Sequence, residues 1–266
     1  MYLKRKADAY LNAWKSDPNR SPLIIKGPRQ VGKTETIDYF AAHNYRSVVE
    51  INFVEEPKYR AITADGYGAN TIVRNISLID PAKKFIPGDT LIFFDEIQAH
   101  PDIATALKFF KIDGKYDVIC SGSMLGISYK QIESNSVGYK TDYEMRSLDF
   151  EEFLWARGYD EAVIESMFTH LRDATPFSEV EMNVFSTAFM DYCVLGGMPA
   201  VVASHIRTGT FEGTLQLQRQ LILDYQEDIR KYAQGLDQAR ILNVFNHIPV
   251  QLAKENKKFQ ISKVAS

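Results

Sequence analysis

Residues Gly27–Thr34 have the sequence GPRQVGKT, which fits the phosphate-loop pattern G-x-x-x-x-G-K-[ST] without a mismatch. The apolar, β-branched segment before it, Pro22–Lys26, is typical of a buried strand. The segment after it, Glu35–Ala42, carries apolar residues at helical spacing. The pattern therefore lies between a strand and a helix, the context that a phosphate loop requires. A chance match in a glycine-containing turn is the weaker interpretation.

The residue types of this loop have the chemistry that a polyphosphate requires. We expect Gly27 and Gly32 to let the backbone curl, so that its N–H groups surround a phosphate at the positive end of the following helix. Lys33 is expected to reach the β- and γ-phosphates, and the Thr34 hydroxyl is expected to bind Mg²⁺. The predicted nucleotide-binding residues are Gly27, Pro28, Arg29, Gln30, Val31, Gly32, Lys33 and Thr34.

A second element, Thr90–Glu96, is an apolar run that ends in two carboxylates. A continuous apolar run is typical of a strand buried on both faces, and open α/β sheets place their ligands at the carboxyl ends of such strands. We expect Asp95 to hold Mg²⁺, directly or through water, and Glu96 to act as the general base on the attacking water. An ordinary helix start is the alternative for Asp-Glu after a strand.

A further strand candidate, Ser47–Phe53, lies between these two elements in the sequence. We therefore expect one strand to be inserted between the phosphate-loop strand and the acidic strand in the sheet, as in NTPases that carry a catalytic glutamate. By analogy this favours hydrolysis over phosphoryl transfer to a small acceptor.

Tyr116–Cys120 is typical of a fourth strand, and Ser-Gly-Ser follows it. Ser121 and Ser123 are candidate sensors of the γ-phosphate or of the attacking water, and an ordinary turn is an equally good interpretation. Asp142–Leu148 is a fifth strand candidate. Within it, Arg146 is either a charge-stabilising arginine or, as the better interpretation, a solvated side chain.

Composition indicates a soluble, cytoplasmic globular protein. The 266 residues are 45% hydrophobic and 24% charged, and no stretch approaches the ~18 apolar residues of a membrane span. Cys120 in a predicted strand and Cys193 in a predicted helix are both expected to be packed thiols. The histidines lack metal-ligand spacing, and His100 is expected to be a loop residue rather than an acid or base. The net charge of −3 gives no overall polyanion-binding signature.

Helical periodicity replaces the alternation of strands and helices after about residue 150. Asp149–Arg157 begins with a capping residue, Glu179–Leu195 is closed by Gly196–Pro199, and Glu212–Tyr232 is a long helix. We divide the chain into an α/β core over residues 1–148, an all-helical lid over 149–235 and an incomplete segment over 236–266.

Five segments together carry a family resemblance: Gly27–Thr34, Phe94–Gln98, Ser121–Ser123, Leu148–Leu154 and Gly196–Pro199. They resemble the loop, "DEIQ", "TGS", "PLSFEEFL" and "GGFP" segments of the prokaryotic AAA-type ATPases, which pair an N-terminal ATPase domain with a C-terminal domain of the DUF4143 type. The resemblance implies a RecA-like or AAA-like phosphate-loop NTPase core, a parallel sheet flanked by helices. It also implies a helical lid and the start of a winged-helix segment.

Two departures from the family pattern affect these expectations. The family usually has Gly-Arg shortly before the fifth strand, where this chain has Gly138–Lys140. Lys140 could replace the arginine only poorly, because it lacks the planar fork. Lys258–Ser266 looks like the opening of a winged-helix motif and stops before a recognition helix, so we expect a fragment or a truncated or degenerate family member.

The leading expectation is Mg²⁺-dependent binding and hydrolysis of ATP that drives a conformational change. Adenine is implied by the resemblance, and the chain has no guanine-specific N-K-x-D segment. The alternative is a nucleotide-gated interaction module with little turnover, which acts on DNA or a protein partner through the C-terminal region. A small-molecule kinase is a third interpretation without an acceptor-site signature. No membrane partner is expected, and an oligomer is compatible with the sequence.

Overall fold

The computed structural model describes residues 1–123, 138–232 and 236–254. The chain forms two compact units, Met1–Thr214 and Leu215–Ser266. The first unit contains the whole of the predicted α/β core and most of the predicted helical lid.

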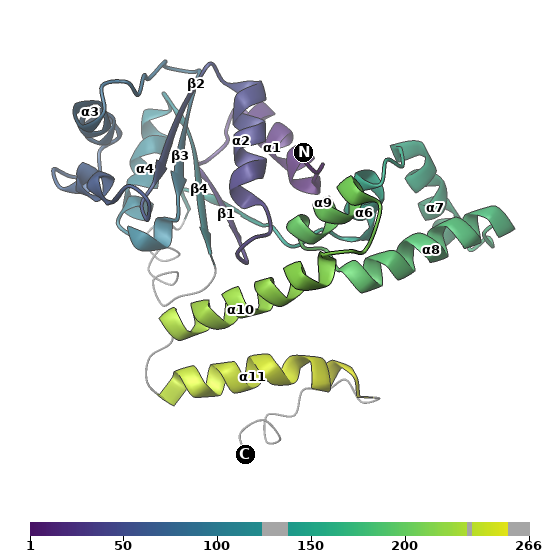
Figure 1. Cartoon of the computed structure of the whole chain (residues 1–266). Helices are drawn as coiled ribbons and strands as arrows, with labels where there is room; N and C mark the ends of the chain where they lie inside the picture. Colours follow the sequence, from purple (N-terminus) through teal and green to yellow (C-terminus); the bar gives the residue numbers. More distant parts are fainter. Residues whose placement is uncertain (124–137, 233–235, 255–266) are drawn as a thin grey trace. The chain divides into compact units, whose positions relative to one another are not determined.

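The first unit is built on a five-stranded sheet with the order β2-β3-β4-β1-β5, in which every strand pair is parallel (Figure 1). β4 therefore lies between the phosphate-loop strand β1 and the acidic strand β3. The expected inserted strand is present, and β2 lies at the edge of the sheet beside β3. The strands are β1 Leu23–Gly27, β2 Ser47–Asn52, β3 Thr90–Asp95, β4 Asp117–Ser123 and β5 Thr141–Glu144.

Helices cover both faces of this sheet. In Figure 1, α1 Lys6–Ser16 and α2 Lys33–Asn44 lie on one side, and α3 Ala69–Ile79 and α4 Ile103–Asp113 lie on the other. Two short 3₁₀ helices complete this part, η1 Pro57–Thr63 and η2 Ile97–Ala99. The arrangement confirms the predicted α/β fold with a parallel sheet flanked by helices.

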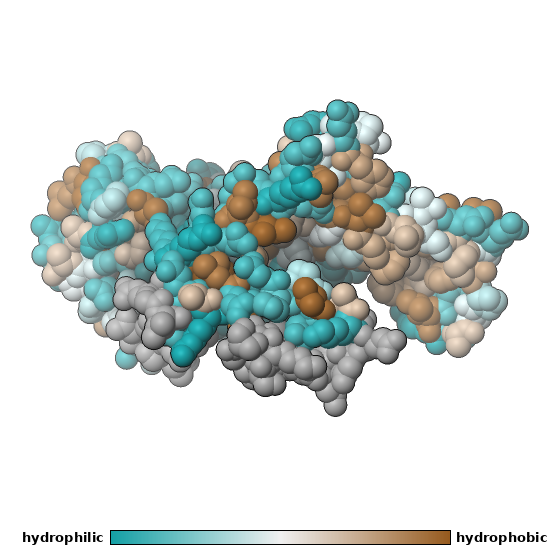
Figure 2. Space-filling view, turned by 60° about the horizontal axis from the view of Figure 1, so that its bottom comes forward, coloured by the Kyte–Doolittle hydropathy of each residue, from teal (hydrophilic) through white to brown (hydrophobic). Residues whose placement is uncertain are grey.

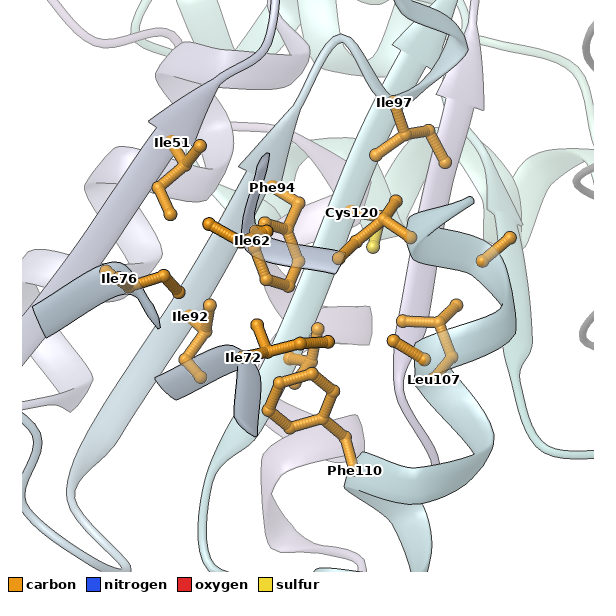
Figure 3. Close-up of a cluster of buried hydrophobic side chains, with 14 of the residues drawn as sticks. Ile51, Ile62, Ile72, Ile76, Ile92, Phe94, Ile97, Leu107, Phe110 and Cys120 are labelled. Atoms are coloured by element: carbon orange, nitrogen blue, oxygen red, sulfur yellow. The ribbon is translucent and has the colours of Figure 1, made fainter. Parts of the chain in front are cut away.

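The continuous apolar run of β3 supplies both cores at once, because successive side chains of a strand point to opposite faces. Ile92 and Phe94 pack among side chains of α3 and α4, including Ile72 and Phe110 (Figure 3). Leu91 and Phe93 belong to the second core, together with Ile37 of α2 and Leu11 of α1.

The two cysteines lie in contrasting environments. Cys120 is fully buried in the core of Figure 3, as predicted, and burial raises the pKa of its thiol. Cys193 lies on α8 Glu179–Leu195 and is exposed, so the expectation that it is packed was wrong. It lies on an outward-facing part of α8, where Met190 and Val194 are also exposed.

The first unit continues in four helices after the sheet: α6 Phe150–Ala156, α7 Glu161–Asp173, α8 and α9 Pro199–Thr208. Asp149 caps α6, as expected, and forms a capping box with Glu152. Leu154, Ile164 and Phe185 form the core of α6, α7 and α8. Figure 2 shows apolar surface over the helical part of this unit. Phe189 of α8 is exposed.

The described part of the second unit contains α10 Thr214–Tyr232, which begins at the last residue of the first unit, and α11 Leu236–Leu252. Contacts between Tyr225 and Phe245 and between Gln226 and Asn246 join the two helices. The predicted winged-helix opening at 258–266 lies outside the described residues. None of the described helices is long and apolar enough to cross a membrane.

The Gly196–Pro199 turn links α8 to α9 and contacts the chain just before α6. Gly196 ends α8 with φ 68°, and Pro199 occupies the first turn of α9, where a proline costs no hydrogen bond. The Leu148 N–H donates to the Gly197 carbonyl over 2.7 Å. A Cβ at Gly197 would lie 2.0 Å from the Leu148 carbonyl oxygen, so only glycine fits this contact.

Gly197→Ala should separate the turn from the segment before α6. We expect the free energy of unfolding to fall by about 1–3 kcal/mol, the cost of overpacking, with a lower Tm by calorimetry. Gly68→Ala is the matched control, because the nearest neighbour of its new Cβ would be the Thr71 hydroxyl at 3.5 Å. Equal stability of the two variants would contradict the close contact at Gly197.

His100 lies in the bend after η2, a loop residue as expected, and its side chain is buried. Its ring lies 4.9 Å from the ring of Phe53, and its Nε2 is 3.0 Å from the Thr63 hydroxyl. Burial lowers the pKa of His100, an effect that Arg60 reinforces and Asp102 opposes. The native protein therefore holds this imidazole neutral at pH values where the unfolded chain would protonate it.

Acid should destabilise the fold through His100, because the unfolded state binds more protons than the native state once the pH falls below about 6.5, the ordinary pKa of histidine. Denaturant unfolding between pH 7.5 and 5.5 should show less loss of stability for His100→Gln than for the wild type. His43→Gln, which replaces an exposed histidine of α2, is the control. The same pH dependence in all three proteins would exclude His100 as the source.

Candidate functional site

The phosphate-loop pattern forms a tight turn between β1 and α2. Its backbone reverses through two left-handed residues, Gln30 with φ 62° and Gly32 with φ 89°. Gly27, which sequence reasoning also assigned to the curl, has a different role. The Met145 N–H donates to the Lys26 carbonyl, and a Cβ at Gly27 would lie 2.0 Å from the Met145 carbonyl oxygen. Gly27 thus permits the close passage of the chain that leaves β5.

Lys33 is drawn into the loop that precedes it. Its side chain is buried, and its ammonium donates to the carbonyl oxygens of Gly27 at 3.0 Å and Pro28 at 2.7 Å. Burial lowers the pKa of Lys33, while the carboxylates of Glu96 and Asp95 act in the opposite direction. The loop therefore holds a partly desolvated cation at its centre, where the oxygens of a phosphate could replace the backbone acceptors.

Asp95, at the carboxyl end of β3, receives hydrogen bonds from three other elements. Its Oδ2 accepts from the Thr34 hydroxyl of α2 at 3.3 Å and from Asn52 Nδ2 of β2 at 3.2 Å. Its Oδ1 accepts from the Ser121 hydroxyl of β4. Thr34 and Asp95 are therefore neighbours, as their predicted joint role requires. Sequence reasoning missed Asn52, although a polar residue at the end of an apolar strand beside β3 was a usable signal.

The donor set fits Mg²⁺ bound together with a polyphosphate. Mg²⁺ is usually held by one or two carboxylates together with substrate phosphates rather than by an all-protein cage. Thr34 and Asp95 present a hydroxyl and a carboxylate at one point beside the loop. Within residues 1–123, 138–232 and 236–254, no group of three or more His, Cys, Asp and Glu side chains could hold a metal ion.

Glu96 follows Asp95 in a left-handed conformation with φ 54°, which is uncommon for a residue with a side chain. It begins the three-residue helix η2 rather than an ordinary α-helix. Gln98 Nε2 donates to a Glu96 carboxylate oxygen. Gly122 of β4 leaves room for Gln98, since a Cβ there would lie 2.9 Å from Gln98 Oε1. The general-base candidate is thus held by a neighbouring amide.

Ser121 and Ser123 belong to β4 itself, so the interpretation of Ser121–Ser123 as a turn was wrong. The parallel pairing of β4 with β1 extends the strand as far as the phosphate loop, with Ser123 opposite Gly27. Both serines are buried. Ser121 binds Asp95, whereas the Ser123 hydroxyl has no hydrogen-bond partner within the described part of the chain.

A comparison with known protein families agrees with the presence of the phosphate loop, the acidic strand β3 and the inserted strand β4. A family model described as an AAA domain matches residues 19–154, more than half of the chain. The chain belongs to the AAA domain family. A second model, for a domain of unknown function (DUF8612), matches residues 186–266. The sequence resemblance had implied a DUF4143-type domain, and the match in this region is to DUF8612 instead.

Two solved structures are similar to this AAA protein. Domain III of the replication initiation protein DnaA from Thermotoga maritima is 16% identical with a TM-score of 0.45, over 91% of this chain and 92% of that one. PCH-2 of C. elegans is 11% identical with a TM-score of 0.36, over 65% of this chain and 49% of that one. No curated protein matches the chain.

Lys140, a candidate charge stabiliser, lies at the amino ends of the strands, away from the phosphate loop. It precedes β5, whose first residue, Thr141, pairs with Leu23 at the start of β1, whereas the loop follows the end of β1. The Lys140 ammonium binds both carboxylate oxygens of Asp142, at 2.7 and 2.6 Å. The sequence order agrees with this position, because a residue that precedes a strand of a parallel sheet lies at the amino ends of the strands, opposite the loop that follows β1.

Arg146, the other candidate charge stabiliser, follows β5 at the carboxyl ends of the strands, where the phosphate loop also lies. Its side chain is 77% exposed and pairs with Glu144, with Nε 3.2 Å from the carboxylate. This arrangement agrees with the solvated interpretation. The Arg146 carbonyl oxygen, by contrast, accepts a hydrogen bond from buried Arg5.

Proposed function

We propose that this AAA protein binds ATP together with Mg²⁺ and hydrolyses it to ADP and phosphate, and that the reaction drives a conformational change. The observation that carries the proposal is the convergence on Asp95. Thr34 of the phosphate loop and Ser121 of the inserted strand bind its two oxygens, and Lys33 and Glu96 lie at the same edge of the sheet.

Binding follows from the loop and the helix behind it. The backbone N–H groups at the start of α2 have no partners inside the helix and would face an anion bound at the loop, where the helix dipole is positive. The Lys33 ammonium would exchange its contacts with Gly27 and Pro28 for phosphate oxygens. Thr34 and Asp95 would hold Mg²⁺, which neutralises charge that develops on the phosphates.

Hydrolysis would be carried out by Glu96 with help from Ser123. A carboxylate within hydrogen-bond reach of a water can accept its proton as the water attacks the γ-phosphorus. Gln98 already holds one oxygen of Glu96, so this amide would set the direction of the carboxylate. The buried Ser123 hydroxyl, opposite Gly27, is suited to contact the γ-phosphate or the attacking water.

A nucleotide-gated module with little turnover, acting on DNA or a protein partner, is the second candidate function. It is favoured by the ion pairs of the two candidate charge stabilisers: Lys140 binds Asp142, and Arg146 binds Glu144. Charge-stabilising arginines contribute large rate factors in phosphoryl transfer. ATP binding that persists without phosphate release would select this function.

Lys33→Ala should weaken ATP binding by at least about tenfold, because it removes a buried cation whose hydrogen bonds to charged groups contribute about 1.5–3 kcal/mol. Titration with a fluorescent ATP analogue in the presence of Mg²⁺ measures this change. Arg29→Ala is the comparison within the same loop, and a smaller effect is expected there. Wild-type affinity in Lys33→Ala would remove the basis for assigning the loop to phosphate binding.

Glu96→Gln should leave ATP bound and slow its hydrolysis by roughly 10²-fold or more, the scale for the loss of a general base. Single-turnover hydrolysis separates this effect from binding. Asp95→Asn should instead weaken the Mg²⁺-dependent binding of ATP, since it removes the charge next to Thr34. If Glu96→Gln hydrolyses ATP at the wild-type rate, another group acts as the base or the gated module is the better description.

A further inference from the structure

We propose that Arg5 is a positioning residue that fixes the orientation of the phosphate loop and joins it to the start of α6. The proposal rests on the proposed function, because its consequence is measured as nucleotide affinity. No sequence motif includes Arg5, which lies between Lys4 and Lys6 and is the N-cap residue of α1.

The Arg5 guanidinium is buried, with 4% of the residue exposed, and each of its nitrogens has a different acceptor. Nη1 donates to the Val31 carbonyl of the loop at 2.7 Å. Nη2 donates to the Arg146 carbonyl after β5 at 2.6 Å, and Nε donates to Glu152 of α6 at 3.2 Å. One side chain thus connects three segments that are far apart in the sequence.

The contact with Val31 sets the direction of an N–H group of the loop. The Val31 carbonyl and the Gly32 N–H belong to the same planar trans peptide, so they point in opposite directions. A carbonyl held by Arg5 on one side therefore turns the Gly32 N–H to the other side. Gln30 and Gly32, on either side of Val31, both have a left-handed backbone. Such an uncommon conformation is kept only where surrounding contacts stabilise it.

The contact with Glu152 connects the same guanidinium to α6. Glu152 is 5% exposed, and its Oε1 also accepts from the Lys6 N–H at 2.7 Å. Its Oε2 accepts from the Asp149 N–H at 3.1 Å and closes the capping box. The Glu152 carboxylate, which closes the capping box of α6, is therefore also the counter-charge of the Arg5 guanidinium that holds the loop. A shift of the Val31 peptide would disturb both.

Lysine could not make these contacts, because three acceptors in three directions require the planar fork of arginine. Arg5→Lys is therefore the decisive change: it keeps the charge and removes the geometry. Arg20 offers a matched control. It binds both oxygens of Asp117 at 2.7 and 2.9 Å and the Asp17 carbonyl at 3.1 Å, and Asp117 opens β4 at the edge away from the loop.

The test compares the wild type, Arg5→Lys and Arg20→Lys by fluorescent ATP-analogue titration, thermal unfolding and NMR of the ¹⁵N-glycine-labelled protein. We expect Arg5→Lys to weaken ATP binding by about tenfold or more, the scale of one lost charged hydrogen bond. The Gly32 amide resonance should also move. Arg20→Lys should lower Tm and leave both the affinity and the Gly32 resonance unchanged, which a purely structural role of Arg5 would not predict.

The proposal is overturned if Arg5→Lys binds ATP within twofold of the wild type and leaves the Gly32 resonance in place. If Arg5→Lys does not fold, Glu152→Gln carries the same test, since it removes only the counter-charge; unchanged affinity and an unchanged Gly32 resonance there also overturn the proposal. Absence of ATP binding by the wild type would refute the proposed function instead, and the Gly32 resonance would still decide whether Arg5 orients the loop.

Discussion

The buried carboxylate of Asp95 is the constraint around which the AAA core is arranged. A charge that is 4% exposed is costly unless hydrogen bonds satisfy it, and here α2, β2 and β4 each supply a donor. Thr34, Asn52 and Ser121 can meet at one carboxylate only when the strands are parallel and in this order, with their carboxyl ends aligned. The hydrogen bonds that satisfy the Asp95 carboxylate therefore require this topology of the sheet.

A second constraint is steric and fixes the helical part to the core. The chain between β5 and α6 passes so close to its neighbours that Gly27 and Gly197 have no room for a Cβ against Met145 and Leu148. The Tyr192 hydroxyl also donates to the Leu148 carbonyl. This segment thus transmits the position of the phosphate-loop strand to α8 and α9. Arg5 adds a charged contact to the same region through the Arg146 carbonyl.

The elements that depend on local pattern were predictable from the sequence. The strands around the loop, the acidic strand and the cap at Asp149 follow from apolar periodicity and residue type. The capping box of α6 satisfies its own neighbours, so no distant contact was needed to find it. The fold class follows from the same signals, because strands that alternate with helices imply a parallel sheet.

The features that depend on distant contacts were not predictable. Glycine and serine are common in turns, so Ser121–Ser123 gave no indication that pairing with β1 would extend the strand. Lys140 was a candidate because it stands near the place where the family usually has an arginine, and the pairing of β5 with β1 puts it away from the loop. Arg5 and Asn52 carry no motif, and their roles arise from acceptors on other elements.

The strand order also has a consequence for how the protein is made. β1 pairs with β4 and β5, both of which are synthesised long after it, while its apolar residues Leu23, Ile24 and Ile25 leave the ribosome early. Parallel pairings between distant segments form slowly, and an unpaired apolar strand is prone to aggregate in the meantime. We therefore expect the phosphate loop to take its shape only after β4 and β5 have been synthesised, and the unpaired β1 strand to be prone to aggregation until then.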